Sequence, residues 1–198
     1  MVNGGFGLRL GLAVLLMAAL AGVSLLGHSP RGNASWVAAQ GPGEFASEPP
    51  EALEPEGALK IGDEVPPFDL PLIGGGRLAL EDLGGEGPVL LVVWAVWCPP
   101  CIDEFRELNR LHERYADQGL RILAVGVRYQ QSLEEIQRFA REQAVNFTVL
   151  YDEREKVVQR YGVEYIPSNF LIDKDGTLRF SDSGLPSDLE ERIQALLS

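Results

Sequence analysis

The chain has 198 residues, of which 45% are hydrophobic and 23% are charged, and its formal net charge at pH 7 is −12. An acidic balance of this size argues against a basic surface for nucleic acid or clustered phosphates, so we expect neither as a partner. The composition changes twice along the chain, which divides the sequence into three parts at residues 1–31, 32–59 and 60–198.

The first part contains an almost uninterrupted apolar stretch from Leu10 to Leu26, with Arg9 before it and Arg31 after it. At about 17 residues, this stretch lies between the core of a signal peptide and a short membrane-spanning helix. A candidate cleavage site falls inside the stretch, which favours an uncleaved anchor over a removed signal. We therefore expect residues 1–31 to be a single-pass anchor in the cytoplasmic membrane, with the rest of the chain on the extracytoplasmic, periplasmic side.

The second part, residues 32–59, changes character because prolines are interleaved with glutamates and cations are missing. Low hydrophobicity, like-charge repulsion and proline together predict an extended, disordered linker. The residues that carry this pattern are Pro42, Pro49, Pro50 and Pro55, with Glu44, Glu48, Glu51, Glu54 and Glu56.

The third part, residues 60–198, has the length of one domain with one core. Apolar runs alternate with helical patterns, and an Asp-Lys-Asp-Gly turn at 173–176 predicts a hairpin. Such alternation, closed by a hairpin and a helix, predicts an α/β fold with a central mixed β-sheet flanked by helices. The predicted strands are 89–93, 121–127, 147–151, 169–172 and 178–181, and the predicted helices are 99–117, 133–142, 155–161 and a last one from Leu189, capped by Pro186-Ser187-Asp188.

The only two cysteines, Cys98 and Cys101, stand between a predicted strand and a predicted helix. This is how a redox-active dithiol is usually presented. A structural disulfide closing so small a ring would contribute only about 2 kcal/mol on the chain-entropy model. A structural zinc site needs four ligands, and only His28 and His112 could supplement the cysteines. The pattern therefore favours redox chemistry, with no metal and no cofactor.

The local sequence also assigns different roles to the two cysteines. With Cys98 as the helix N-cap, Pro99 and Pro100 fall at the first two helical positions, where an N–H is not needed. The backbone N–H of Cys101 then points at the Cys98 sulfur, and this donor and the positive helix end favour thiolate over thiol. We therefore expect Cys98 to be the attacking nucleophile and Cys101 to resolve the mixed disulfide.

Glu104 lies within the apolar stripe of the same helix, on the side of Cys101, when residues are placed at about 100° intervals. Two interpretations remain open. The carboxylate reaches water at the edge of the stripe, or it is a partly buried carboxyl with a raised pKa that exchanges protons with Cys101. His112 also lies near the stripe, and we expect it to be a core or boundary residue.

Three segments carry a family resemblance. Residues 61–70, IGDEVPPFDL, resemble the opening motif G-D-x-x-P-x-F-x-L of TlpA/ResA-like membrane-anchored thioredoxins, which are related to redoxins of the AhpC/TSA type. Residues 94–101, WAVWCPPC, and 161–173, YGVEYIPSNFLID, resemble the active-site and proline segments of that family in the same order. The resemblance implies a thioredoxin-like fold and a protein-disulfide reductase. It further implies clients such as the haem-site cysteines of apocytochrome c and a thiol electron donor in the membrane.

The resemblance also implies roles for further residues. Ile166–Pro167 corresponds to the cis-proline segment, which packs against the dithiol and pairs with the incoming peptide, so Pro167 joins Cys98, Cys101 and Glu104 as a candidate catalytic residue. Glu104 matches a glutamate that ResA-like proteins carry three residues after the second cysteine. Val92 stands where thioredoxin itself has a buried aspartate. The candidate substrate groove consists of Trp97, Pro99, Pro100, Tyr165 and Ile166.

Two other functions compete with this one. A peroxiredoxin-like thiol peroxidase shares the amino-terminal segment, but its chemistry needs a Thr three residues before the reactive Cys, where this chain has Ala95. A copper metallochaperone of this type uses a wider Cys spacing and a distant His, and no histidine follows His112. The peroxidase hypothesis predicts that the reduced protein consumes peroxide, and the metallochaperone hypothesis predicts that it binds copper.

Overall fold

The structure is a computed structural model, and it describes residues 59–198. The expected anchor at 1–31 and the expected linker, apart from its last residue, lie outside the described residues. Within 59–198, none of the helices has the length and apolar character needed to cross a bilayer.

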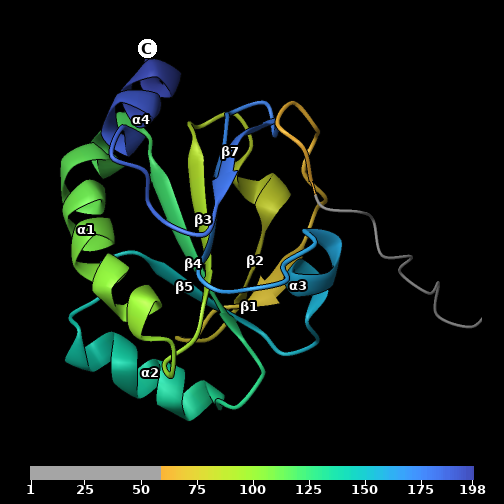
Figure 1. Ribbon diagram of the computed structural model, residues 1–198, viewed down its shortest axis with the longest axis vertical. Helices are drawn as coiled ribbons and strands as arrows, with labels where there is room; N and C mark the ends of the chain where they lie inside the picture. The colour runs from red at the N-terminus through yellow and green to blue at the C-terminus, as the bar shows by residue number, and fades with distance from the viewer. Residues whose placement is uncertain (1–58) are drawn as a thin grey trace, which may run out of the picture. The chain divides into compact units, whose positions relative to one another are not determined.

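A five-stranded sheet with the order β5-β4-β3-β6-β7 forms the centre of the described region (Figure 1). Strands β3, β4 and β5 run parallel to one another, whereas β6 is antiparallel to both β3 and β7, so the sheet is mixed as predicted. The central strand β3 is buried along its whole length, as expected for a strand covered on both faces. The strands are β3 Val89–Trp94, β4 Arg121–Val127, β5 Thr148–Asp152, β6 Ser168–Ile172 and β7 Leu178–Asp182.

Helices cover both faces of the sheet (Figure 1). On one face, α1 and α2 meet above the end of β3, where the ring of Trp94 lies 4.5 Å from that of Phe105 and 4.9 Å from that of Phe139. On the other face, Tyr161, directly after α3, packs edge-on against Phe170 of β6. The helices are α1 Pro99–Tyr115, α2 Leu133–Glu142, α3 Lys156–Arg160 and α4 Leu189–Leu197.

The structure adds elements that the sequence analysis did not predict. Strands β1 (Asp69–Pro71) and β2 (Arg77–Ala79) form a small antiparallel pair, followed by the 3-10 helix η1 (Leu80–Leu83). Each strand has three residues, too few to show a period-two pattern in the sequence. The pair adds a second, two-stranded sheet before the main one begins.

The structure corrects the predicted end of one helix and the predicted cap of another, and it makes α3 one residue shorter at each end than the predicted 155–161. Helix α1 ends at Tyr115, and the predicted last residues form the separate 3-10 turn η2 (Ala116–Gln118) before Gly119, whose φ is 110°. Asp188 stands at the start of α4, but its side chain caps no backbone N–H. Its carboxylate instead pairs with Arg192 at 2.8 Å, so a charged partner one turn later displaces the capping bond.

Candidate active site

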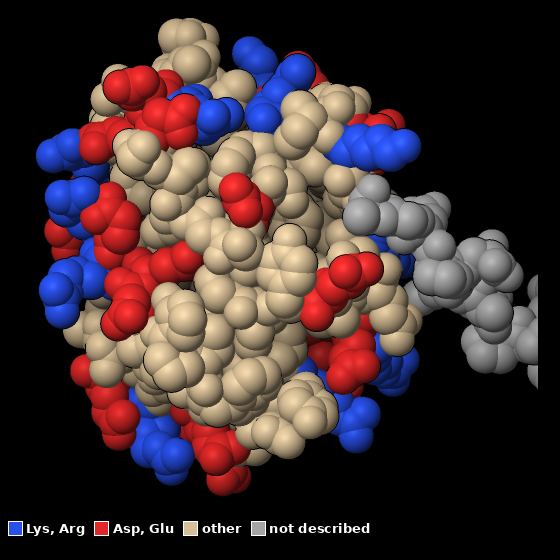
Figure 2. All heavy atoms as spheres, viewed as in Figure 1, with Lys and Arg blue, Asp and Glu red and all other residues tan. Residues whose placement is uncertain are grey.

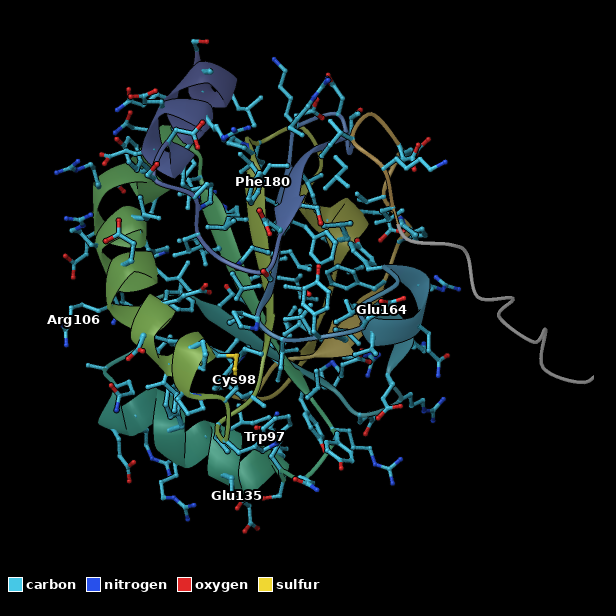
Figure 3. All side chains as sticks on the ribbon, in the orientation of Figure 1. Trp97, Cys98, Arg106, Glu135, Glu164 and Phe180 are labelled. Atoms are coloured by element: carbon cyan, nitrogen blue, oxygen red, sulfur yellow. A yellow bond between two sulfur atoms is a disulfide. The ribbon has the colours of Figure 1, made fainter. Side chains whose placement is uncertain are left out.

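The two cysteines lie where β3 passes into α1, and the structure holds them as a disulfide with Sγ atoms 2.10 Å apart (Figure 3). Cys98 is the N-cap of α1, with φ −103° and ψ 99°, and the backbone N–H of Cys101 donates to its Sγ at 3.3 Å. Pro99 and Pro100 occupy the first two helical positions. Since neither proline has an N–H, the Cys101 amide is the first donor of the helix that the Cys98 sulfur can meet.

The surroundings of the two sulfurs differ. The Cys98 side chain reaches the surface beside the exposed prolines, with 4% of the residue accessible, whereas Cys101 is fully buried. The Cys98 sulfur lies at the N-terminal end of a helix of 17 residues, whose dipole favours a negative charge there. We therefore expect that, once the disulfide is reduced, the helix end and the Cys101 amide favour a thiolate on Cys98 rather than on Cys101.

The loop before β6 closes the other side of the dithiol. The Ile166–Pro167 peptide bond is cis, and the Ile166 carbonyl oxygen lies 3.8 Å from the Cys98 Sγ. Ser168 donates its hydroxyl to the Tyr165 carbonyl at 2.7 Å and so ties the loop to the first residue of the strand. Pro167 is buried and Tyr165 is exposed. The structure therefore brings both proline segments of the sequence, 99–100 and 166–167, to the same dithiol.

Trp97 lies directly beside the dithiol and has 42% of its surface exposed (Figure 3). Its indole N–H donates to the Tyr129 carbonyl at 2.8 Å, and the two aromatic rings meet edge-on with centroids 5.9 Å apart. Tyr129 is itself exposed and comes from the loop between β4 and α2. The sequence analysis missed Tyr129, because a contact across 32 positions leaves no local pattern.

A buried glutamine joins the same loop to the active-site segment. Gln131 accepts a hydrogen bond from the Val96 N–H at 2.8 Å and donates its amide to the Val127 carbonyl. Its side chain therefore fixes the backbone two residues before Cys98 against the end of β4. The sequence analysis missed this residue as well.

Glu104 is partly buried on α1, and its pKa is raised from the ordinary value. Burial is the largest cause, while a hydrogen bond from Asn169 and another from the Leu185 backbone lower the pKa in opposition. The Asn169 amide lies 3.4 Å from Oε1 and 3.3 Å from Oε2 of the carboxylate. The geometry therefore matches the partly buried carboxyl of the two interpretations, whereas its exchange of protons with Cys101 stays a prediction.

Asn169 shows how this chain places a polar group beside the helix that carries the dithiol. It pairs in the sheet with Val92, the position where thioredoxin itself has an aspartate. Directly paired residues of antiparallel strands point to the same face, so β6 supplies the polar side chain there while β3 supplies an apolar one. A sequence signal existed, because Asn169 is a polar residue among the buried positions of β6.

The remaining titratable candidate, His112, lies at the boundary of the core. Its ring is 6.3 Å from the ring of Phe147, and its pKa is lowered, first by burial and then by the charge of Arg121. Across residues 59–198, the structure holds no group of three or more His, Cys, Asp or Glu side chains placed to bind a metal ion.

The fold and the site define a class: a thioredoxin-like α/β protein with a Cys-x-x-Cys disulfide at a helix N-terminus, facing a cis-proline loop. Residues 61–181 match the AhpC/TSA family. The chain belongs to the AhpC/TSA family.

Among characterised relatives, the chain is similar to the thiol-disulfide oxidoreductase ResA of several bacilli, which confirms the resemblance found in the sequence. ResA of Bacillus thuringiensis (strain Al Hakam) is 35% identical over 118 residues, or 60% of this chain and 66% of the relative. ResA of Geobacillus thermodenitrificans is 32% identical over 141 residues, or 70% of this chain and 79% of the relative.

Solved structures agree on the fold. A Chlorobium tepidum protein, provisionally named thiol:disulfide interchange protein DsbE, superposes with a TM-score of 0.66 at 31% identity, covering 71% of this chain and 100% of that one. The thioredoxin domain of a thiol-disulfide oxidoreductase from Bacteroides vulgatus gives a TM-score of 0.64 at 19% identity, covering 71% of this chain and 100% of that one. At that identity the second likeness concerns the fold alone.

Proposed function

We propose that this chain is a thiol–disulfide oxidoreductase that reduces disulfides in protein clients. The observation that carries the proposal is the position of Cys98. Its sulfur meets the first free amide of α1 at 3.3 Å and lies 3.8 Å from the Ile166 carbonyl. A thiolate is therefore stabilised next to a backbone group that can align an incoming peptide.

The reaction passes two electrons from the dithiol to the client. The Cys98 thiolate attacks one sulfur of the client disulfide, which forms a mixed disulfide and releases the other client sulfur as a thiolate. The Cys101 thiol then loses its proton to the Glu104 carboxylate, and the resulting thiolate attacks the Cys98 sulfur. The second client thiolate leaves, the Cys98–Cys101 disulfide forms, and an external dithiol must reduce it before the next cycle.

The surface beside Cys98 fits an extended polypeptide better than a small solute. Trp97, Tyr129 and Tyr165 are exposed aromatic side chains from three different segments around the dithiol. Uncharged atoms make up most of the middle of this face, with a few Asp and Glu side chains among them, and Lys and Arg side chains lie at its margins (Figure 2). Exposed aromatic groups near the Ile166 carbonyl, which lies 3.8 Å from the Cys98 sulfur, offer apolar contact and a main-chain hydrogen-bond acceptor to a client.

The proposed location and partners are supported by the sequence and by the resemblance alone. The apolar stretch from Leu10 to Leu26 supports an anchor in the cytoplasmic membrane, with the catalytic domain on the extracytoplasmic side. In such a compartment, clients such as the haem-site cysteines of apocytochrome c need a reductant to stay reduced. A thiol carrier in the membrane would supply the electrons.

Reduction of insulin disulfides by the purified protein tests the activity. We expect wild type to reduce insulin, Cys98→Ser to abolish the reaction, and Cys101→Ser to accumulate mixed disulfides that reducing agents release. Wild-type protein that reduces neither insulin nor a model cystine peptide would contradict the proposal.

A thiol peroxidase is the second candidate, because the amino-terminal segment of the domain resembles that of peroxiredoxin-like proteins and the chain belongs to the AhpC/TSA family. Ala95, three residues before Cys98, is fully buried and has no hydroxyl to hold a peroxide. We therefore expect peroxide consumption by the reduced protein to be slow compared with insulin reduction. A copper titration of the reduced protein tests the third candidate in the same way.

A further inference from the structure

Asn169 is a fully buried polar residue in the middle of the sheet. Its backbone is already paired on both sides, with β3 and with β7, so the side chain is not needed to complete the sheet. An uncompensated amide in such a place costs stability, and asparagine is disfavoured in strands compared with β-branched residues. The presence of Asn169 therefore needs a reason other than the strand itself.

The Asn169 side chain has one described side-chain partner. Its Nδ2 lies 3.3 Å and 3.4 Å from the two carboxylate oxygens of Glu104, which comes from α1, 65 positions earlier. Its Oδ1 is buried without a hydrogen-bond partner among the described residues. An amide has both a donor end and an acceptor end, and only the donor end is used in this arrangement.

We propose that Asn169 is a positioning residue that holds the Glu104 carboxyl in both of its charge states for proton exchange with Cys101. This inference rests on the proposed function as a dithiol reductase. When Glu104 is ionised, Nδ2 donates to the carboxylate as observed. When Glu104 has taken the Cys101 proton, a half-turn of the amide presents Oδ1 to accept the new carboxyl O–H.

The position of Glu104 on α1 makes it the recipient of that proton. Glu104 follows Cys101 by three residues, and side chains so spaced on a helix are neighbours. Glu104 is only partly exposed, so water offsets its change of charge incompletely, and a fixed hydrogen-bond partner compensates for the part that burial removes. The backbone of Gly184 also lies close to this carboxyl, since a Cβ built at that position would be 3.9 Å from Glu104 Oε1.

Other charged groups near the pair are engaged elsewhere. On α1, Glu107 forms an ion pair with Arg110 at 2.5 Å. On β7, Asp182 pairs in the sheet with Asn169, and its carboxylate accepts the Ser183 N–H at 2.7 Å. The influences that act on the Glu104 carboxyl are therefore burial, Asn169 and the Leu185 backbone. Asn169 is the side chain among them that a substitution can change.

The test compares two replacements of Asn169, valine and threonine, that are nearly isosteric with each other. Asn169→Val removes the donor, while Asn169→Thr keeps a hydroxyl that can donate or accept. Carbon NMR of the Glu104 carboxyl in the oxidised protein follows its titration directly. We expect the midpoint to rise by about one pH unit in Asn169→Val, because a hydrogen bond to the charged form is lost, and to rise less in Asn169→Thr. Asn169→Ala carries the same expectation as Asn169→Val if the valine variant does not fold.

The acid limb of the pH–rate profile for insulin reduction should move with the NMR midpoint. In a Glu104→Gln background, Asn169→Val should cause no further shift. Equal midpoints in wild type and Asn169→Val would overturn the proposal. So would Asn169 variants that still reduce insulin but show no shift in the acid limb of the pH–rate profile. Wild-type protein that reduces no disulfide at any pH would overturn the proposed function, and the carboxyl titration would still decide whether Asn169 controls Glu104.

Discussion

At the scale of single residues, the two cysteines share one helical turn but differ in access to solvent. Cys98 is 4% exposed at the helix end and Cys101 is fully buried beneath it. We expect limiting iodoacetamide to modify Cys98 at least about tenfold faster in the reduced protein, because only the accessible thiolate reacts. Mass spectrometry of the two peptides measures the ratio. The single variants Cys98→Ser and Cys101→Ser are the controls, and preferential labelling of Cys101 would contradict the N-cap role of Cys98.

Glu104 should shape the pH dependence of turnover. Burial raises the pKa of this carboxyl, so Glu104 becomes able to accept a proton only at pH values above its ordinary range. Turnover of wild type should fall as the pH drops through the raised pKa. Glu104→Gln should lack this fall and should be slower at neutral pH by about tenfold or more. Superimposable pH–rate profiles of the two proteins would show that Glu104 takes no part in proton exchange.

Glu104 should also affect the stability of the fold, in the opposite sense. Turnover needs the ionised carboxylate, whereas the folded state is more stable when the carboxyl is protonated. Because its folded-state pKa is raised above 4.5, the folded protein binds this proton more tightly than the unfolded chain, and ionised Glu104 lowers stability. The free energy of unfolding therefore falls as pH rises from about 4.5 through the raised pKa. We expect Glu104→Gln to be the more stable protein above this window and equal to wild type below it. Urea unfolding of both oxidised proteins across pH measures the difference.

At the scale of elements, α2 lies unusually close to β4. A Cβ added at Gly126 would lie 2.7 Å from Cδ1 of Ile136, so the helix approaches the strand at a position without a side chain. We expect Gly126→Ala to cost about 1–3 kcal/mol of stability, because the Ile136 side chain must move.

Removing the δ-methyl group supplies the matched control. Ile136→Val alone should cost about 0.5–1.5 kcal/mol. In the double variant the two costs should not add, and the coupling should exceed about 0.5 kcal/mol in favour of the pair. Additive costs in urea unfolding would mean that the strain at Gly126 does not come from Ile136.

The elements also show how far the sequence could predict the site. The N-cap role of Cys98 depends on residues within four positions, and the structure has the arrangement that the local sequence predicts. The pair of Glu104 and Asn169 spans 65 positions, and the pair of Val96 and Gln131 spans 35. Such contacts depend on strand order and on how α1 crosses the sheet, which local periodicity does not encode. Asp188 failed as a cap for a different, local reason, since Arg192, four residues later, pairs with its carboxylate.

At the scale of the whole molecule, charge should influence which clients arrive fastest. The chain has a formal net charge of −12 at pH 7. On the face that carries the dithiol, Asp and Glu side chains reach further toward the uncharged centre than Lys and Arg do (Figure 2). A negative field of this kind raises the rate at which positively charged molecules meet the protein. We expect a cystine peptide flanked by lysines to be reduced faster than one flanked by glutamates, by about threefold or more at low ionic strength.

Salt separates this effect from a preference of the groove itself. At about 0.5 M salt the screening length falls below 5 Å, so long-range attraction is lost while contacts at Trp97 and Tyr165 remain. The ratio of the two second-order rate constants should therefore shrink toward one as salt is added, and a peptide flanked by serines should change little. A ratio that persists in high salt would place the selectivity in direct contacts beside Cys98. Equal rates at low salt would mean that the acidic charge serves no steering role and that client choice depends on the groove alone.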